Sequence, residues 1–300
     1  MTTRYRLLFA ALVVLAACGA AHGQELEPRR YVNTPTGANF VAVVYGLSTG
    51  NVLLDPSFPV EGLDAELHVV ALRYVRSAGL FGKNGRFVVA LPASSGDWSG
   101  AVDRDLRTRR IDGFGDLRVG ATINFIGAPA LQQVEFSDFT ARTVVGASIQ
   151  VNVPTGQYDP DRLLNLGSNR WTFIPEIGAS HVSGRWTFEL TARAWLFTKI
   201  RDFFGGNELT QRALLAAQIH SVYTFRPGLW IAGGIGLANG GRTSVNGAAR
   251  DTFQRNSRFG LVLAYPIARQ HGLRATFGAS ITTTNGADFR TFGFGYQYAW

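Results

Sequence analysis

The last residues of the chain alternate strictly between aromatic and small or polar side chains. Phe292, Phe294, Tyr296, Tyr298 and Trp300 occupy every second position, and glycine, glutamine or alanine stands between them. A period of two is that of a β-strand, because successive side chains point to opposite faces. A terminal strand with one aromatic face is typical of a membrane β-barrel, whose wall it closes against the first strand. The edge of a soluble β-sandwich can show the same alternation, so the rest of the chain has to decide between them.

The chain begins with the pattern of a secretory signal peptide. Two arginines precede an apolar run, residues 7–17, which is too short to span a membrane as a helix. Two processing sites compete, one after Gly23 and one of the lipoprotein type, at which Cys18 is acylated and becomes the new N-terminus. We expect cleavage after Gly23, which makes residues 1–23 the signal peptide and residues 24–300 a single outer-membrane β-barrel. Cys18 is the only cysteine, so the mature chain has no disulfide and no cysteine metal site.

The composition excludes a helical membrane protein and does not favour a nucleic-acid binder. No later apolar run is as long as a membrane-spanning helix requires, and the mean hydropathy is close to neutral. The net charge of +8 comes almost wholly from arginine, since Lys83 and Lys199 are the only lysines. These arginines are scattered singly along the chain, whereas a nucleic-acid site gathers them into a patch with stacking aromatics.

Period-two segments recur along the chain and predict twelve antiparallel strands. In residues 185–197, for example, Trp186, Phe188 and Leu190 share one face, and Thr187 and Glu189 share the other. The predicted strands are 37–48, 63–76, 86–93, 116–125, 142–153, 171–182, 185–197, 211–225, 229–239, 254–267, 273–284 and the segment that follows the tight Asn285-Gly286 turn.

The segments outside these strands differ in composition and in length. Residues 24–36 are polar and predicted to be irregular, residues 94–113 are a long polar stretch predicted to be a loop, and residues 127–139 are predicted to form a turn with one helical turn in it. Connections after even-numbered strands are mostly shorter than those after odd-numbered strands. In outer-membrane barrels the short turns are periplasmic and the long loops external, so both termini are expected in the periplasm.

Ionisable side chains in mid-strand decide between a soluble and a membrane barrel. A soluble barrel of the lipocalin type turns its apolar face inward, whereas an aromatic-flanked apolar face with closure of every edge fits a lipid exterior. We therefore predict an all-β fold, an up-and-down transmembrane antiparallel β-barrel of about twelve strands. The candidate lumen-lining residues are Asp116, Arg118, Glu176, Glu189, Arg193, His220, Arg258 and Arg274.

These charged residues allow two interpretations. They can line a permeation path and orient a polar headgroup or a phenol hydroxyl, or they can satisfy only one another in a lumen filled by side chains. The second interpretation is favoured, because glutamate and arginine occur together on the same faces.

Several segments carry a family resemblance. They are VPTGQYDPDRLLNLGSNRW at 153–171, GRTSVNG at 241–247, NSRFGLVLAYPI at 256–267, the turn from Pro227 to Trp230, and the terminal YQYAW. With these segments the chain resembles the outer-membrane transporters associated with the meta-cleavage pathway of phenol degradation, over most of its mature length. The resemblance implies a barrel that admits hydrophobic or aromatic small molecules and is distantly similar to long-chain fatty-acid transporters.

The segment 154–170 is the strongest loop candidate. Its proline and glycines end the preceding strand and permit turns, because proline cannot donate to a ladder. Its leucines can fold back into the barrel mouth as a lid over a ligand pocket, or the loop can pack on itself outside the barrel. The lid candidates are Pro154, Gly156, Asp159, Leu163, Leu164, Asn165, Asn169 and Arg170.

The sequence does not favour an enzyme. His181 and Ser183 have the spacing of the catalytic pair in outer-membrane phospholipase A, but they lie at the shortest turn and lack a nearby asparagine. His68, His220 and His271 lack partners at metal-ligand spacing, and we expect neither a metal nor a cofactor.

We therefore predict a passive outer-membrane channel or transporter for small hydrophobic or aromatic solutes. The alternative is a non-conducting structural or adhesive barrel, or a hydrolase that acts on lipid. The expected partners are outer-membrane lipid, the solute, and the barrel-assembly machinery, which would bind the C-terminal strand that ends at Trp300.

Overall fold

The computed structural model describes residues 26–53, 60–102, 105–162 and 164–300. The predicted signal peptide, both processing sites and Cys18 therefore lie outside the described residues. In these ranges the chain is mostly β-strand, with one short helix, α1 (Gln133–Phe136), inside the predicted turn at 127–139. No helix in the same ranges is long and apolar enough to cross a membrane.

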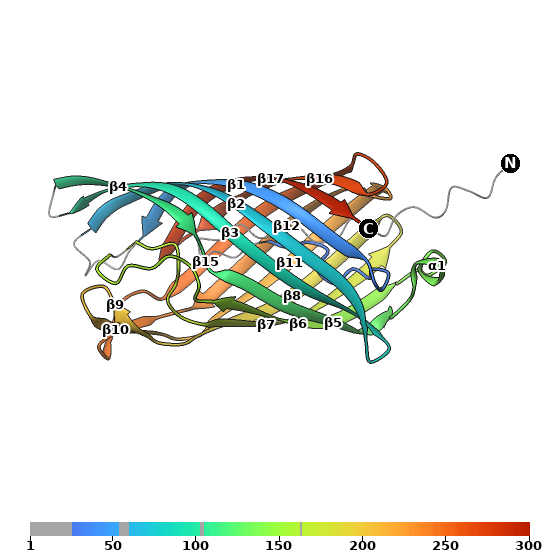
Figure 1. Cartoon of the computed structure of the whole chain (residues 1–300), viewed down its shortest axis with the longest axis horizontal. Coiled ribbons are helices and arrows are strands. Elements are labelled where there is room, and N and C mark those ends of the chain that lie inside the picture. Colours follow the sequence, from blue (N-terminus) through green and yellow to red (C-terminus); the bar gives the residue numbers. More distant parts are fainter. Residues whose placement is uncertain (1–25, 54–59, 103–104, 163) are drawn as a thin grey trace.

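Twelve of the described strands form a closed antiparallel barrel (Figure 1). Each strand pairs with its neighbours in the chain, and the β1–β17 pairing closes the wall, so the predicted class, number and meander order are confirmed. The barrel strands are β1 (Asn39–Leu53), β2 (Val60–Leu80), β3 (Lys83–Val102), β5 (Leu117–Pro129), β6 (Thr143–Val153), β7 (Thr172–Ser183), β8 (Trp186–Phe197), β11 (Leu214–Arg226), β12 (Leu229–Gly240), β15 (Gln254–Pro266), β16 (His271–Thr282) and β17 (Gly286–Ala299).

The aromatic C-terminal strand closes the barrel as predicted. Phe40 lies opposite Ala299 in the β1–β17 ladder, which extends from there along both strands. At its end, the Asn39 and Trp300 backbones exchange two hydrogen bonds, with N–O distances of 2.9 and 3.0 Å. Closure leaves the barrel wall without an unpaired strand edge, which a membrane requires because lipid cannot satisfy backbone groups.

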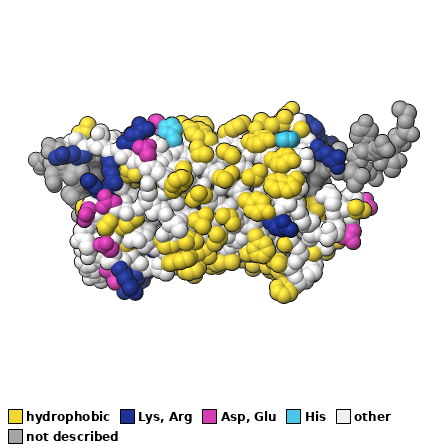
Figure 2. Space-filling view, in the orientation of Figure 1, with side chains coloured by type: hydrophobic (Ala, Val, Ile, Leu, Met, Phe, Trp, Pro, Cys, Tyr) yellow, Lys and Arg dark blue, Asp and Glu magenta, His cyan; other side chains and the backbone are white. Residues whose placement is uncertain are grey.

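The wall is apolar outside and polar inside. On β8 the exposed fractions of Trp186, Phe188 and Leu190 are 46%, 49% and 58%, whereas Thr187 and Glu189 are buried. On the face of the barrel that Figure 2 shows, hydrophobic side chains cover the middle of the wall, and most charged side chains lie near the two ends. Large apolar side chains on the outside of a closed sheet are expected for a wall that faces lipid.

The long connections gather at one end of the barrel, here called the loop rim. The other end, the turn rim, carries the short turns and the C-terminus (Figure 1). Two of the long connections fold into a small separate sheet at the loop rim. It consists of β9 (Ile200–Phe203), β10 (Asn207–Gln211), β13 (Thr243–Val245) and β14 (Ala248–Ala249).

The prediction that the polar stretch 94–113 forms a loop is wrong. Strand β3 continues to Val102, and β4 (Asp105–Phe114) pairs with it from Val102↔Asp105 to Ala93↔Phe114. The two strands project beyond the loop rim as a ribbon (Figure 1). Where neither face of a strand packs on a core or on lipid, polar side chains occur on both faces and the period-two contrast disappears.

Residues 26–38, here called the N-terminal segment, are irregular, as predicted for residues 24–36, but their position was not predicted. The segment is not part of the wall; its side chains contact inward-facing residues of many strands, and Tyr31 and Thr34 are only 2% and 1% exposed. The segment therefore lies inside the barrel.

Candidate functional site

Wall side chains hold the backbone of the N-terminal segment inside the lumen. Asn84 on β3 donates its amide N–H to the Thr34 carbonyl at 2.6 Å, and Asn124 on β5 donates to the Tyr31 carbonyl at 3.1 Å. The Thr34 hydroxyl also donates to the Ser77 hydroxyl on β2 at 3.0 Å. A buried irregular backbone needs such partners, because its peptide groups cannot join a strand ladder.

Glu176 on β7 joins the wall to the segment. Its carboxylate accepts hydrogen bonds from the Tyr31 hydroxyl at 2.8 Å and forms ion pairs with Arg30 Nε at 2.9 Å and Arg193 Nε on β8 at 2.5 Å. The Glu176 side chain is only 1% exposed, and the Arg193 side chain is 7% exposed. One buried carboxylate thus forms ion pairs with an arginine of the wall and with an arginine of the segment.

A second anchor lies nearer to the turn rim. The backbone N–H of Arg29 donates to Glu189 Oε2 at 2.7 Å, and the Arg29 guanidinium lies 5.3 Å from the centre of the Trp230 ring. Arg274 on β16 contacts the same ring at 5.5 Å. These distances fit cation–π contacts, which are stronger away from water.

Glycines in the wall make room for Tyr31. A Cβ atom added at Gly146 on β6 or at Gly178 on β7 would overlap the Tyr31 ring. Large side chains at these two inward positions would therefore exclude the ring from its site, since protein interiors have little free space.

We expect Gly178→Val to loosen the N-terminal segment without opening the wall, because valine is favoured in strands but overlaps the Tyr31 ring. Trypsin should then cleave after Arg29 and Arg30 faster than in the unmodified chain. Gly233→Val is the matched control, because the nearest neighbour of its Cβ is the flexible Leu261 side chain at 3.5 Å. Equal cleavage rates in the two variants would contradict this role of Gly178.

Seven of the eight predicted lumen-lining residues lie on the inner face of the wall. Glu176, Glu189, Arg193, His220 and Arg274 are almost fully buried there. Arg118 lies an even number of residues from the buried Asn124 on β5, so both side chains point to the same face. Arg258 donates to the carbonyl of the buried Phe289 at 3.3 Å. Asp116 is different, because it precedes β5 and binds a loop. That these side chains line a solute path stays a prediction.

Sequence reasoning missed several charged residues of the interior. Arg73 on β2 and Arg86 on β3 are 7% and 4% exposed, and Arg86 donates to the carbonyl of Arg30. Both occupy mid-strand inward positions like the arginines that were identified, so the same alternation could have found them. The segment residues Arg30 and Tyr31 gave no such signal, because they belong to no periodic pattern.

Asp116 fixes the connection 154–170 at the loop rim. Its carboxylate accepts hydrogen bonds from the backbone N–H groups of Gly156 and Ser168, both at 3.0 Å, and from the Ser168 hydroxyl at 2.5 Å. Inside the loop, Asn165 accepts from the Asp159 N–H at 2.9 Å and donates to the Asp159 carbonyl at 3.0 Å. These bonds pack the loop on itself, as in one of its two interpretations.

The other predicted loop residues lie in the same connection, except that Leu163 is outside the described residues. Among the described loop candidates, Arg170 is the only buried one. It is 7% exposed, donates to Gln211 Oε1 at 2.6 Å, and stacks on the inward-facing Phe197 at 4.2 Å. Burial lowers the pKa of Arg170 to about 10, so the guanidinium stays charged at neutral pH. That Pro154, Gly156, Asp159, Leu164, Asn165, Asn169 and Arg170 act as a lid stays a prediction.

We expect Asp116→Ala to release the loop, because three donors lose their acceptor, at a cost of roughly 1–3 kcal/mol for each donor that stays buried. Trypsin cleavage after Arg162, in the middle of the loop, should become faster. Asp138→Ala, an exposed aspartate in the connection at the turn rim, is the control. Unchanged cleavage after Arg162 would show that Asp116 does not hold the loop.

His181 and Ser183, which have the spacing of a hydrolase pair, do not have the surroundings of a catalytic dyad. His181 is exposed on the outer face near the turn rim, and its Nδ1 atom lies 2.8 Å from the Thr143 hydroxyl. Catalytic dyads instead use this nitrogen to fix the ring with an acidic or amide group. The described residues contain no cluster of three or more His, Cys, Asp or Glu side chains that could hold a metal ion.

The family is decided by a match over nearly the whole barrel. Residues 33–298 match the profile of the family described as "Putative MetA-pathway of phenol degradation". The chain belongs to this family. The resemblance seen in the sequence is thereby confirmed. The family match begins after Tyr31, so the arginines and the tyrosine that anchor the N-terminal segment lie outside the matched range.

Solved structures confirm the barrel fold of this family member. An outer membrane channel from Pseudomonas putida F1 superposes with a TM-score of 0.79 at 23% identity, over 92% of this chain and 100% of that chain. The transport unit of the autotransporter AIDA-I from Escherichia coli gives a TM-score of 0.51 at 7% identity, over 88% and 90% of the two chains. No protein of curated function matches the chain by sequence.

Proposed function

We propose that the chain is a passive channel of the bacterial outer membrane for small hydrophobic or aromatic solutes. In this proposal residues 1–23 are the signal peptide, residues 24–300 are the mature protein, and the turn rim with both termini faces the periplasm. The barrel-assembly machinery recognises the strand that ends at Trp300. The apolar exterior, the polar interior and the family's link to phenol degradation support this function.

The observation that carries the proposal is that a segment outside the wall occupies the lumen. The N-terminal segment occupies it through hydrogen bonds, ion pairs and ring contacts, and it is joined to β1 through Gly37. Gly37 has φ of +84°, a conformation that glycine adopts without strain, so the segment can change direction there. A segment that is held only by non-covalent contacts can move out of the lumen, whereas side chains that belong to the wall cannot.

The interior toward the loop rim suits a small aromatic solute. Trp195 and Phe197 on β8 pack there beside Leu214, Ala216 and Ala238. The guanidinium of Arg193 lies 5.7 Å from the Trp195 ring, and that of Arg170 lies 4.2 Å from the Phe197 ring. Rings flanked by arginines offer stacking surfaces with nearby donors, so the ring and the hydroxyl of a phenol both find partners.

A non-conducting structural barrel is the second candidate, and the burial of so many inward side chains favours it. Swelling of liposomes that contain the purified chain distinguishes the two. A channel of the proposed kind admits benzoate, which crosses lipid slowly because it is charged, faster than glucose, its non-aromatic control. Swelling no faster than that of protein-free liposomes for every solute would overturn the channel.

A further inference from the structure

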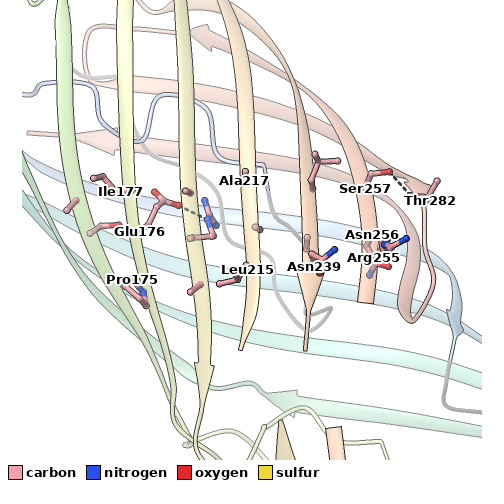
Figure 3. Close-up of a pocket in the computed structure, with 18 residues that line it drawn as sticks. Pro175, Glu176, Ile177, Leu215, Ala217, Asn239, Arg255, Asn256, Ser257 and Thr282 are labelled. Atoms are coloured by element: carbon pink, nitrogen blue, oxygen red, sulfur yellow. Dashed lines mark hydrogen bonds and ion pairs between the residues drawn. The ribbon is translucent and has the colours of Figure 1, made fainter. Parts of the chain in front are cut away.

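A hollow of about 930 Å³ lies on the outer face of the wall, across β6 to β16 (Figure 3). Among its lining residues, Ile177, Leu215 and Leu237 point outward and are 54%, 58% and 57% exposed. The inward-facing Ala216 and Ala238 behind them are only 7% and 4% exposed, because Trp195 and Phe197 cover them from inside. The hollow therefore opens to the lipid side and not to the lumen.

The hollow follows an oblique row of paired residues. The strands are tilted to the barrel axis (Figure 1), so a row of paired residues climbs from the middle of the wall toward the loop rim. In pairing order, the row consists of Ile177, Ala192, Ala217, Leu237, Ser257 and Thr282. Its start is apolar, its middle has a floor of short alanine side chains that leave room above them, and its end at the loop rim is polar.

The rim end of the hollow is basic. Arg255 on β15 is exposed and lies opposite Asn239 in the β12–β15 ladder, and both residues line the hollow. Arg255 thus stands at the polar end of an apolar slot, an arrangement that matches an acyl chain with an anionic headgroup.

We propose that this hollow binds lipid A, with one acyl chain along the alanine floor and a phosphate of its headgroup at Arg255. The proposal rests on the proposed function, since it requires the loop rim to lie in the outer leaflet, where lipopolysaccharide is. Lipid tails elsewhere in the membrane are as apolar as the slot, so selection must come from its shape and from the charged headgroup. An arginine fork suits a phosphate group, with which it forms two hydrogen bonds.

Native mass spectrometry of the mature chain tests the proposal, with lipid A added in one sample and phosphatidylglycerol in another. The unmodified chain should retain lipid A preferentially. Ala217→Trp, which fills the slot, and Arg255→Gln, which removes one charge-assisted contact, should each lower retention roughly tenfold. The matched controls are Ala275→Trp, an outward alanine away from the hollow, and Arg269→Gln, an exposed arginine at the turn rim. Both should retain lipid A as the unmodified chain does.

Equal retention of lipid A by Arg255→Gln and Arg269→Gln would overturn the proposal, as would equal retention of phosphatidylglycerol by the unmodified chain. Arg255→Gln carries the test even if Ala217→Trp does not fold, because residue 255 is exposed at the rim. Liposome swelling by the same samples separates this proposal from the channel. A chain that binds lipid A but admits no solute would contradict only the channel.

Discussion

Deletion of residues 26–33 is expected to raise the single-channel conductance of the reconstituted chain several-fold. The deletion removes Arg29, Arg30 and Tyr31, which contact Glu189 and Glu176, and leaves all strands of the wall intact. Water then replaces the segment around the charged side chains of the lumen. A barrel of twelve strands is wider than the small barrels that side chains fill and narrower than the porins that hold an aqueous channel. The space that the segment vacates is therefore expected to conduct ions. Conductance across planar bilayers measures the change.

A reversible lock is the control for this deletion. The Thr34 and Ser77 hydroxyl oxygens are 3.0 Å apart, so cysteines at both positions place their sulfur atoms close enough to form a disulfide. The Thr34→Cys/Ser77→Cys chain, prepared without Cys18, should admit benzoate only when the disulfide is reduced. Entry of benzoate at the same rate in the oxidised and reduced chain would show that solutes pass without moving the segment.

The wall could be predicted from sequence because lipid imposes a local rule. Successive residues of β8 and β17 alternate between the lipid-facing outside, which favours apolar side chains, and the inside. The outward Trp186, Phe188 and Phe292 therefore identify these segments as strands without knowledge of which strands they pair with. The same rule fails where the environment is water on both faces. The β3–β4 ribbon beyond the loop rim therefore looked like a loop, although its backbone pairs as regularly as that of the wall.

The closure of the lumen could not be predicted, because it depends on pairs that are distant in the sequence. The composition of a polar, irregular segment such as 26–38 does not show whether the segment lies on the surface of a protein or inside a polar lumen. What distinguishes the two is the match of Arg30 and Tyr31 with Glu176 and of Arg29 with Glu189, which only the folded barrel brings together. The glutamates were identified as inward from their strand parity, but their partners in the segment were not.

Glu176→Gln is expected to be the most destabilising single substitution of the interior. It removes the negative charge that Arg30 and Arg193 share and leaves both guanidinium groups without it in a site where the Glu176 side chain is 1% exposed. Removing one partner of a buried ion pair costs about 3–5 kcal/mol, because the remaining charge has lost its solvation by water as well as its partner. Unfolding in urea from detergent micelles should show a decrease of this order in the free energy of unfolding.

Glu208→Gln is the matched control, because Glu208 forms an ion pair at 2.9 Å with Lys199 in which both side chains are largely exposed. Such exposed pairs contribute about 0–1 kcal/mol, since water screens them and the long side chains lose entropy on pairing. If the loss in Glu176→Gln arises from the two arginines that lose this carboxylate, adding Arg30→Gln should recover part of it, because Arg193 is then the only one of the two that remains without it. A double variant as unstable as the sum of its single variants would mean that Glu176 and Arg30 act independently, and the segment would then not be held by this ion pair.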